Sequence, residues 1–499
     1  MVTPAVHRPA ENPDGWEAVW GVIASAAANR RLTWPLLGVL TSLVFAITFR
    51  DSFGSDDFTL LAWARTAPLR DLLATFEVWK PRHLGPLLYL VFYLQYRIFG
   101  VAAWGYRLVS IDLHVIAVIL VYEICRRLLH RPLVALLAAL SFAWQPAHSQ
   151  AVMWDAAVDH VISSTSYLAA LLLFLAYLDT HRRVFLGITL LAVVLSMLAK
   201  DESLTLPPIL FLSEFLLFDR RLTVERLAKY APLIALFVPY LLARSGYYLL
   251  VRSTLPYGLG WHMPGKLWDY ATSLALPLPV HFADRVTQQA PWFGLLRRLA
   301  AIGTLLGLTS AALLGRARDA AREPFRRRRL VAFVLAWGMM STLPFLPFTY
   351  GISPRYAYLP AVPFSILSAL AFQSVWRATP GRRARLGIVV LASAVLVFYA
   401  GSTLYNERDS YFTGLLCADL MQRVEESAPQ IEPGTRILLV DSPLAAQSAR
   451  PIFHFSHAPS VGNLQAIVNV TRDSPEYRAA ESDAAALVFV YEGGKFRRQ

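Results

Sequence analysis

The chain contains little cysteine and little charge. Only two cysteines, Cys125 and Cys417, occur among its 499 residues, so the fold cannot depend on a framework of several disulfide bonds. Charged residues make up 16% of the chain, whereas soluble domains contain about a quarter. Hydrophobic residues account for 56%, and they form repeated apolar runs of about 16–20 residues, a length suited to spanning a bilayer. The composition therefore predicts a polytopic membrane protein.

Several common catalytic motifs are also missing. The segment GWHMPGKL matches part of a phosphate-binding loop, but Leu267 occupies the position that requires Ser or Thr. There is no G-x-S-x-G nucleophile elbow. His148, Asp155, Asp159 and His160 fit no zinc-site spacing. We therefore expect no metal site and no required cofactor, although a divalent cation would be compatible with the chain.

The basic residues lie in short clusters between the apolar runs. This pattern is typical of cytoplasmic loops, and it argues against nucleic-acid binding because no single basic face or tail is formed. If every cluster is cytoplasmic, the chain crosses the membrane about eleven times, with its N-terminus inside and its C-terminus outside. The two cysteines then lie on opposite sides and cannot pair. The clusters occupy residues 30–31, 126–131, 181–183, 220–229, 316–329 and 377–385.

We expect an α-helical polytopic bundle with three parts. Residues 1–33 form a cytoplasmic segment, residues 34–404 the transmembrane domain, and residues 405–499 a small extracytoplasmic α/β domain with strand-like runs RILLV and ALVFVY. The first span is expected to be retained, because no signal-peptide pattern precedes it. PLLYLVFYLQYRIFG in the first outer loop is predicted to be an interfacial amphipathic helix. Frequent Arg and Ala suggest a bacterial source. With the predicted spans, this leads us to expect a multi-pass protein of the bacterial inner membrane.

Polar residues occur at the outer tips of the predicted hairpins. Asp56 and Asp57 follow the first span, where carboxylates are often functional, but the pair could equally cap a short helix beginning at Phe58. The other tips hold polar groups that could converge with this pair in one pocket, although local ion pairing and snorkelling would also explain several of them. These residues are Lys80, Arg82, His83, His148, Gln150, Trp154, Asp159, Lys200, Glu202, Arg355 and Tyr356.

Three charged or titratable residues have particular surroundings. Arg355 lies among aromatic residues where the chain re-enters the membrane. Its planar guanidinium could bind two phosphate oxygens, or it could anchor the chain at the interface beside Tyr356 and Tyr358. Asp112 and His114 fall within the second span, so both are expected to face protein and to form interhelical hydrogen bonds.

The order of these motifs resembles that of the polytopic GT-C glycosyltransferases. The closest similarity is to the protein O-mannosyltransferase-like branch, related to the tetratricopeptide-repeat O-mannosyltransferases but without the repeats. It rests on the acidic pair, YRLVSIDLH, WQPAHSQAVMW, LAKDESLTLPPILFLSEFLL and SPRYAYLP, across roughly residues 35–375. The chain departs from the pattern at three positions, with Gln145 for a His, Gln150 for a Glu and Val158 for an Arg.

The resemblance implies an inverting transferase that moves a sugar from a polyprenyl-phosphate donor to a hydroxyl of a protein, glycan or lipid on the outer face. Asp56 is the expected general base, with Asp57 as its orienting partner or substitute. The donor phosphate would be bound by cationic residues, namely Arg355, Lys200, Lys80, Arg82 and His83. The sugar or acceptor would contact His148, Gln150, Trp154, Asp159, Glu202 and Tyr356.

Two other classes of protein remain open. A lipid or solute carrier could use Asp112 and His114 as a proton relay, although the sequence shows neither an internal repeat nor broken midplane helices. A non-catalytic scaffold on the same fold would accommodate the departures at Gln150 and Val158. In every case the expected partners include membrane lipids and exclude nucleic acid.

Overall fold

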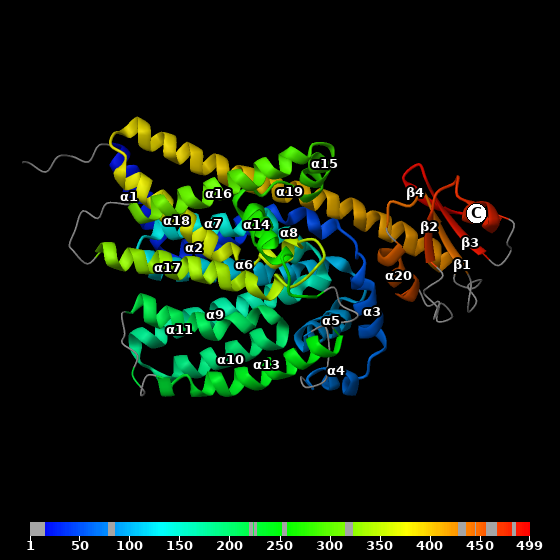
Figure 1. Cartoon of the computed structure of the whole chain (residues 1–499), viewed down its shortest axis with the longest axis horizontal. Coiled ribbons are helices and arrows are strands. Elements are labelled where there is room, and N and C mark those ends of the chain that lie inside the picture. Colours follow the sequence, from blue (N-terminus) through cyan, green and yellow to red (C-terminus); the bar gives the residue numbers. More distant parts are fainter. Residues whose placement is uncertain are drawn as a thin grey trace, which may run out of the picture.

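The computed structural model describes residues 15–77, 85–218, 223, 227–251, 257–314, 323–427, 436–444, 446–455, 467–481 and 486–499. Lys80, Arg82 and His83 lie outside these residues. The described chain is mostly helical, and its helices form an elongated bundle with a small sheet beyond one end (Figure 1).

The long apolar segments of the sequence form the helices of this bundle. Among the described residues, four helices are long and apolar enough to cross a membrane, namely Ala103–Leu129, Asp155–Thr180, Pro291–Leu314 and Arg382–Ser427. Three shorter apolar helices accompany them. The expectation of membrane-length helices is thereby confirmed, whereas the count of eleven crossings and their orientation stay predictions. Both cysteines are buried free thiols, as expected.

The first half of the chain, up to residue 217, contains eleven of the described α-helices and four short 3-10 helices. The α-helices are α1 (Gly15–Ala28), α2 (Arg30–Val44), α3 (Asp56–Thr66), α4 (Leu69–Thr75), α5 (Pro86–Phe99), α6 (Ala103–Leu129), α7 (Pro132–Ala143), α8 (Ser149–Met153), α9 (Val158–Thr180), α10 (Arg183–Ala199) and α11 (Leu206–Leu217). Short 3-10 helices connect them at η1 (Ala46–Arg50), η2 (Pro146–His148), η3 (Asp155–Ala157) and η4 (Asp201–Thr205).

The second half completes the bundle and adds the sheet. Its helices are α13 (Ala231–Val251), α14 (His262–Ala275), α15 (Val280–Gln289), α16 (Pro291–Leu314), α17 (Glu323–Thr342), α18 (Ala361–Ala378), α19 (Arg382–Ser427), α20 (Ala446–Phe455) and α21 (Pro475–Glu481), with the 3-10 helices η5 (Leu343–Phe345) and η6 (Pro354–Ala357). The strands are β1 (Arg436–Val440), β2 (Ile467–Val470), β3 (Ala486–Glu492) and β4 (Lys495–Arg498).

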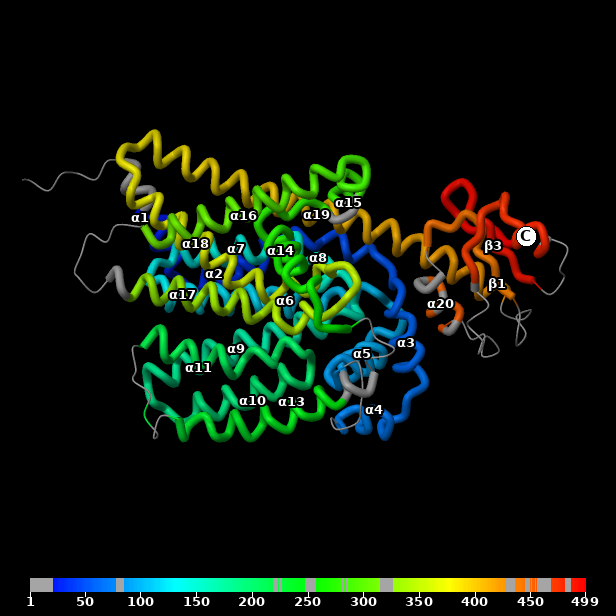
Figure 2. The backbone as a smooth tube through the Cα atoms, in the orientation of Figure 1, coloured from blue at the N-terminus to red at the C-terminus, as the bar shows by residue number. Residues whose placement is uncertain are grey.

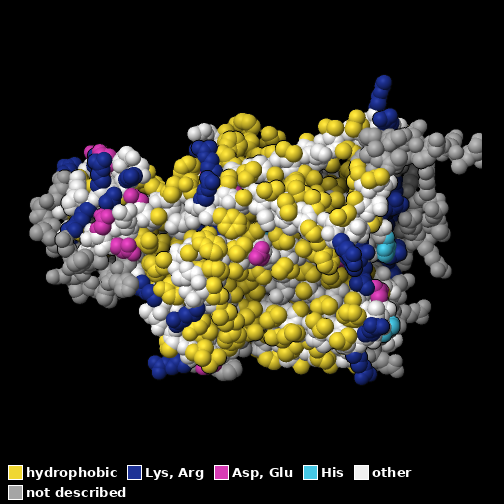
Figure 3. All heavy atoms as spheres, turned by 180° about the vertical axis from the view of Figure 1, so that it is seen from behind, with side chains coloured by type: hydrophobic (Ala, Val, Ile, Leu, Met, Phe, Trp, Pro, Cys, Tyr) yellow, Lys and Arg dark blue, Asp and Glu magenta, His cyan; other side chains and the backbone are white. Residues whose placement is uncertain are grey.

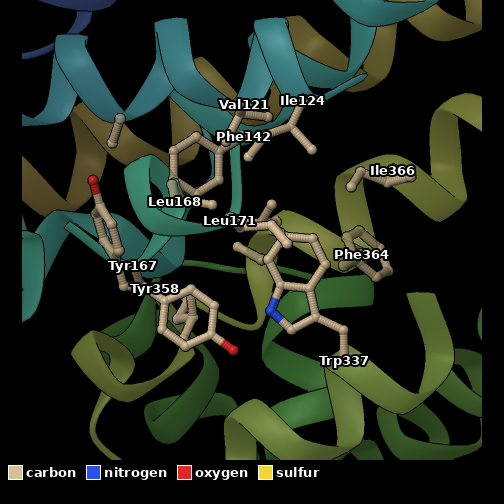
Figure 4. Close-up of a cluster of buried hydrophobic side chains, with 14 of the residues drawn as sticks. Val121, Ile124, Phe142, Tyr167, Leu168, Leu171, Trp337, Tyr358, Phe364 and Ile366 are labelled. Carbon is tan, nitrogen blue, oxygen red and sulfur yellow. The ribbon is translucent and has the colours of Figure 1, made fainter. Parts of the chain in front are cut away.

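The core of the bundle lies where α6, α7, α9, α17 and α18 meet (Figure 4). Tyr167 and Trp337 stack with ring centroids 6.3 Å apart. Ala135, Ala138 and Ala139 are fully buried on α7, and such small residues let neighbouring helices approach closely in a membrane. The core therefore combines large aromatic groups with close backbone packing.

The expectation that His114 and Asp112 both face protein is half right. His114 is buried, and its Nε2 lies 3.1 Å from the Ala143 carbonyl of α7, an interhelical hydrogen bond. Its Nδ1 lies 2.6 Å from the hydroxyl of Tyr358, in the turn before α18. Asp112 is exposed instead. It shares the outward stripe of α6 with Trp104, Leu108 and Ile116, which are also exposed and spaced four residues apart. The two side chains point in different directions, which disfavours the proposed proton relay.

Apolar side chains cover the middle of the bundle, and Lys and Arg side chains lie mainly toward its ends (Figure 3). Large exposed hydrophobic residues on α2, α10, α16 and α19 contribute to this surface. An apolar girdle between charged ends is the distribution expected of a protein that crosses a bilayer.

One helix, α19, connects the bundle to the sheet. It is a single helix of 46 residues, so the predicted domain boundary at residue 404 falls within it.

The sheet has the order β2-β1-β3-β4, with β1 parallel to β2 and β3, and β4 antiparallel to β3. The strands predicted at RILLV and ALVFVY are confirmed as β1 and β3. A bond from the Phe496 amide to the Asp419 carboxylate, 2.6 Å long, fastens the sheet to α19.

Candidate functional site

The acidic pair lies at the start of α3, at the end of the bundle nearer the sheet (Figures 1 and 2). The helix begins at Asp56, two residues before the predicted start at Phe58. Ser55 precedes it with a φ of 41° and forms no side-chain cap. A non-glycine residue in this backbone region carries strain, which is found often at functional sites.

The two carboxylates have different surroundings. Asp57 is fully buried, and its oxygens accept the backbone N–H groups of Gly54 and Ala156 at 3.0 and 2.7 Å. Burial raises the pKa of Asp57 well above its ordinary value, the Asp155 charge raises it further, and Arg107 partly offsets the rise. Asp57 therefore fastens the loop before α3 to the α8–α9 connection.

Asp56 keeps part of its side chain exposed. Burial nevertheless raises the pKa of Asp56, and the positive charge of Arg355 partly offsets that rise. Asp56 begins α3 and Arg355 belongs to η6, and residues next to them in the chain, namely Ser55, Asp57 and Pro354, line one pocket. The acidic pair and the predicted phosphate ligand therefore flank the same pocket.

A buried arginine, Arg107, connects the loops around this pair. Its side chain is 2% exposed and lies 3.0 Å from Asp155 Oδ1 and 3.8 Å from Asp51 Oδ2. The guanidinium also donates to the Ser52 carbonyl at 3.0 Å and to the Met153 carbonyl. Arg107 on α6 thus joins the chain before α3 to the end of α8.

Arg355 lies between two of the predicted aromatic ligands. Its guanidinium carbon is 4.9 Å from the Trp154 ring centroid and 4.7 Å from that of Tyr356, both within cation–π range. One nitrogen donates to the Tyr356 hydroxyl at 3.2 Å, and the Arg355 amide donates to Gln150 Oε1 at 3.4 Å. Three residues predicted to contact sugar or acceptor therefore surround the predicted phosphate ligand.

A second polar cluster lies beside Tyr356. Lys200 Nζ donates to Asp159 Oδ2 at 2.7 Å, and Glu202 accepts from Ser164 at 2.9 Å and contacts His160. The His160 ring centroid is 5.3 Å from that of Tyr356. Burial raises the pKa of Glu202 well above its ordinary value. Asp159 and Glu202 are both fully buried, so their contacts are with protein groups and not with an open cavity.

His148 is separated from these groups. It is fully buried, with its ring centroid 4.5 Å from Phe142, 4.5 Å from Tyr358 and 5.2 Å from His114. The structure places this predicted sugar or acceptor ligand within the aromatic core.

A pocket of about 650 Å³ opens beside Asp56 and Arg355. Its lining includes Gln150 and Trp154, the neighbours Ser55 and Asp57 on either side of Asp56, and Pro354 immediately before Arg355. A second wall, polar over most of its length, comes from α19, and Pro443 and Leu444 after β1 complete it. The α19 residues are Asn406, Asp409, Ser410, Thr413, Gly414, Leu416 and Cys417.

Several of these residues were not predicted. Arg107 lies within YRLVSIDLH, and a charged residue in a long apolar segment is a signal that would have identified it. Asp409 and Ser410 were missed because they follow the predicted boundary at residue 404. No local pattern marks them as pocket residues.

The acidic residues do not form a metal centre in the described part of the chain, where no three His, Cys, Asp or Glu side chains are grouped to hold an ion. Arg107 already supplies positive charge to Asp51, Asp57 and Asp155.

Residues 80–242 match the family model described as dolichyl-phosphate-mannose-protein mannosyltransferase. Two Drosophila melanogaster proteins are also similar: protein O-mannosyl-transferase Tmtc1 is 32% identical over 120 residues, and Tmtc2 is 32% identical over 127 residues. Each match covers 24% of this chain and 14% of the relative's length. The resemblance to the protein O-mannosyltransferase branch is thus confirmed for this part of the chain.

Two solved structures also align with most of the chain. The structure of ArnT from Cupriavidus metallidurans bound to undecaprenyl phosphate has a TM-score of 0.45 at 12% identity, covering 96% of this chain and 93% of that one. The Archaeoglobus fulgidus oligosaccharyltransferase tethered with an acceptor peptide has a TM-score of 0.48 at 13% identity, covering 89% of this chain and 64% of that one.

Proposed function

We propose that this protein is an inverting glycosyltransferase that moves a sugar from a polyprenyl-phosphate donor to an acceptor hydroxyl. The reaction takes place beside α3, on the face of the membrane where the sheet lies. The observation that carries the proposal is a pocket of about 650 Å³ lined by Asp57, by Trp154, which packs on Arg355, and by Pro354, which precedes it. The family match over residues 80–242 supports the donor class, since its description names a dolichyl-phosphate sugar.

The reaction is a single displacement at the anomeric carbon. The acceptor oxygen forms a bond to that carbon while the bond from the carbon to the phosphate oxygen breaks, and the bonding electrons leave with the polyprenyl phosphate. Asp56 takes the proton of the acceptor hydroxyl. Attack opposite the leaving phosphate inverts the configuration, and one carboxylate is sufficient for this step.

Asp56 is a better base than Asp57 for structural reasons. Both oxygens of Asp57 already accept backbone N–H groups, and its side chain is fully buried. Asp56 is partly exposed at the first turn of α3. A base must reach its proton within hydrogen-bond distance. Asp57 lines the pocket and Asp56 stands between two lining residues, Ser55 and Asp57, but only Asp56 has an exposed carboxylate. Asp57 is then the residue that orients it.

Arg355 is proposed to stabilise the charge that develops on the departing phosphate. Its guanidinium is held between Trp154 and Tyr356, so little reorganisation is needed when the charge appears. Lys200 adds positive charge from the neighbouring cluster while paired with Asp159. The leaving group needs no protonation, because a phosphate ester oxygen departs as an anion. Lys80, Arg82 and His83 stay predicted contributors.

The acceptor is proposed to enter from the side of α19 and the sheet. Asn406, Asp409 and Ser410 provide hydrogen-bonding groups on that wall, and Pro443 and Leu444 bring the sheet-bearing segment to the pocket. Gln150 and Trp154 separate this wall from Arg355. A protein, a glycan and a lipid hydroxyl all suit this chemistry.

The test is sugar transfer in proteoliposomes that contain radiolabelled polyprenyl-phosphate mannose or glucose. Release of polyprenyl phosphate is measured with Ser/Thr peptides, oligosaccharides or lipids as acceptors. We expect Asp56→Asn to slow transfer by about 10²–10⁴-fold, the usual contribution of a general base, without changing the yield of folded protein. The anomeric configuration of the product is determined by NMR.

Asp71→Asn is the matched control, because Asp71 is an exposed carboxylate on the neighbouring helix α4. It should transfer at the wild-type rate. Equal rates for Asp56→Asn and wild type would refute the assignment of the base, and a product with retained configuration would refute the single displacement.

A further inference from the structure

A second cavity lies between α1, α7, α18 and α19, with a volume of about 790 Å³. It is within the size range of ligand pockets, about 300–1,000 Å³. Arg107 lies near the start of α6 and His130 follows its end. The 23 positions between them correspond to roughly 35 Å of helix, so the two residues lie at opposite ends of the bundle. The cavity contains His130 in its wall, so it belongs to the end opposite Asp56.

The walls of this crevice are mainly apolar. Leu137 and Leu140 on α7, Phe372 and Trp376 on α18 and Leu396 on α19 line it. Gly21 contributes from α1, and a Cβ added there would meet no atom within 4 Å. A small residue at this position leaves room for a guest chain between the helices.

One end of the crevice is cationic. Arg131 precedes the first turn of α7, and Arg377 belongs to the last turn of α18; both line the cavity and are exposed. His130 lies beside them and receives a contact from Arg326 at 2.6 Å. Among the described residues that line the crevice, none is acidic. The charge therefore favours an anion at this end.

The depth of the crevice corresponds to one leaflet of a bilayer. Nine residues separate Arg131 from Leu140 along α7, which amounts to roughly 14 Å of helix. Half of a hydrocarbon core about 30 Å thick has nearly the same depth. The outer flank of α19 beside it is apolar and exposed, with Val390 and Leu391 60% and 66% exposed. Lipid tails are the molecules that such a surface meets.

We propose that this crevice binds one anionic phospholipid from the leaflet opposite Asp56. The acyl chains lie between α7 and α19 against Phe372 and Trp376, and the phosphate headgroup is bound by Arg131 and Arg377. Basic pockets between membrane helices bind anionic headgroups by this combination of charge and apolar surface. The inference does not depend on the proposed transferase activity.

The test uses the purified, delipidated full chain and measures thermal unfolding during titration with phosphatidylglycerol or zwitterionic phosphatidylcholine. We expect phosphatidylglycerol to raise Tm by several degrees more than phosphatidylcholine. The double variant Arg131→Gln/Arg377→Gln should need at least tenfold more phosphatidylglycerol for the same shift. Ala392→Trp, which fills the crevice and keeps both arginines, should lose the shift as well.

Arg182→Gln/Arg183→Gln is the matched control. These exposed arginines lie at the turn between α9 and α10 and do not line the crevice. The turn is at the same end of the bundle as the crevice, because Asp179 at the end of α9 pairs with Arg127 at the end of α6 at 2.6 Å. This variant should respond as wild type does. Equal responses of wild type to the two lipids would overturn the proposal. A full phosphatidylglycerol response in both crevice variants, or stabilisation by polyprenyl phosphate alone, would do the same.

Discussion

Replacement of Arg107 by Met should destabilise the protein by about 3–5 kcal/mol at neutral pH, the usual cost of removing one member of a buried ion pair. The Arg107 side chain is 2% exposed and faces Asp51, Asp57 and Asp155. Without it, three buried carboxylates lose their shared countercharge. The carbonyls of Ser52 and Met153 also lose a charged donor, which moves the cost toward the upper end of that range.

The cost should grow as the pH rises. Burial raises the folded-state pKa values of Asp51 and Asp57 above their unfolded values, and the Arg107 charge offsets part of each rise. A carboxyl group with a raised folded pKa contributes stability below its unfolded pKa, near 3.9, and loses that contribution as the pH rises through its folded pKa. Removing Arg107 raises both folded pKa values further. In the variant, the free energy of unfolding therefore keeps falling up to a higher pH. The difference in this free energy between wild type and variant widens between about pH 4 and pH 8.

The measurement is the thermal unfolding of wild type and Arg107→Met in detergent from pH 4.5 to 8. We expect Tm to fall by roughly 5 °C at pH 7.5 and by less at pH 4.5. The addition of Asp155→Leu should recover part of the loss, because the remaining buried negative charge is then smaller. Arg97→Met is the control, since Arg97 is an exposed arginine of α5 that hydrogen-bonds to and stacks on Tyr93 and lies outside the Arg107 cluster.

The reasoning would be refuted by an Arg107→Met protein that melts within about 1 °C of wild type at pH 7.5. A difference in Tm that stays constant across the pH range would also refute it, because the loss would then come from packing and not from uncompensated carboxylates.

Two further predictions concern the same site. Arg355→Gln should move the acid limb of the kcat/KM pH profile to higher pH, because loss of the Arg355 charge raises the pKa of Asp56 and a protonated base is inactive. Arg355→Lys keeps the charge and should leave the limb in place. An acid limb that does not move in Arg355→Gln would contradict the pairing of Asp56 with Arg355. Gly414→Ala should destabilise the protein by about 1–3 kcal/mol, since its Cβ would collide with the Asp51 carboxylate. Gly401→Ala on the same helix meets open space and should be neutral or stabilising in the same unfolding assay, so equal effects at the two glycines would contradict the close approach.

Much of the candidate site was predictable from the sequence because its parts are local signals. Asp56 follows the first apolar segment, and Arg355 lies in an aromatic segment between helices. Their residue types, with the family resemblance, predicted a base and a phosphate ligand, and residues adjacent to both line one pocket. The sequence could not show that Asp57 is buried and hydrogen-bonded whereas Asp56 is not. Asp57 accepts the backbone N–H of Ala156, which lies about a hundred residues later in the chain.

The sequence alone determined the long apolar helices and the two apolar strands β1 and β3, since these runs carry their own hydrophobic pattern; it did not indicate β2 (Ile467–Val470) or β4 (Lys495–Arg498). It did not determine which face of each helix is buried. In a membrane the lipid is as apolar as the protein interior, so hydrophobic residues do not mark the core; Asp112 is exposed and Arg107 is buried on the same helix. Only tertiary packing decided that α19 forms the second wall of the pocket and that Arg107 holds its loops, because each depends on contacts between segments distant in the chain.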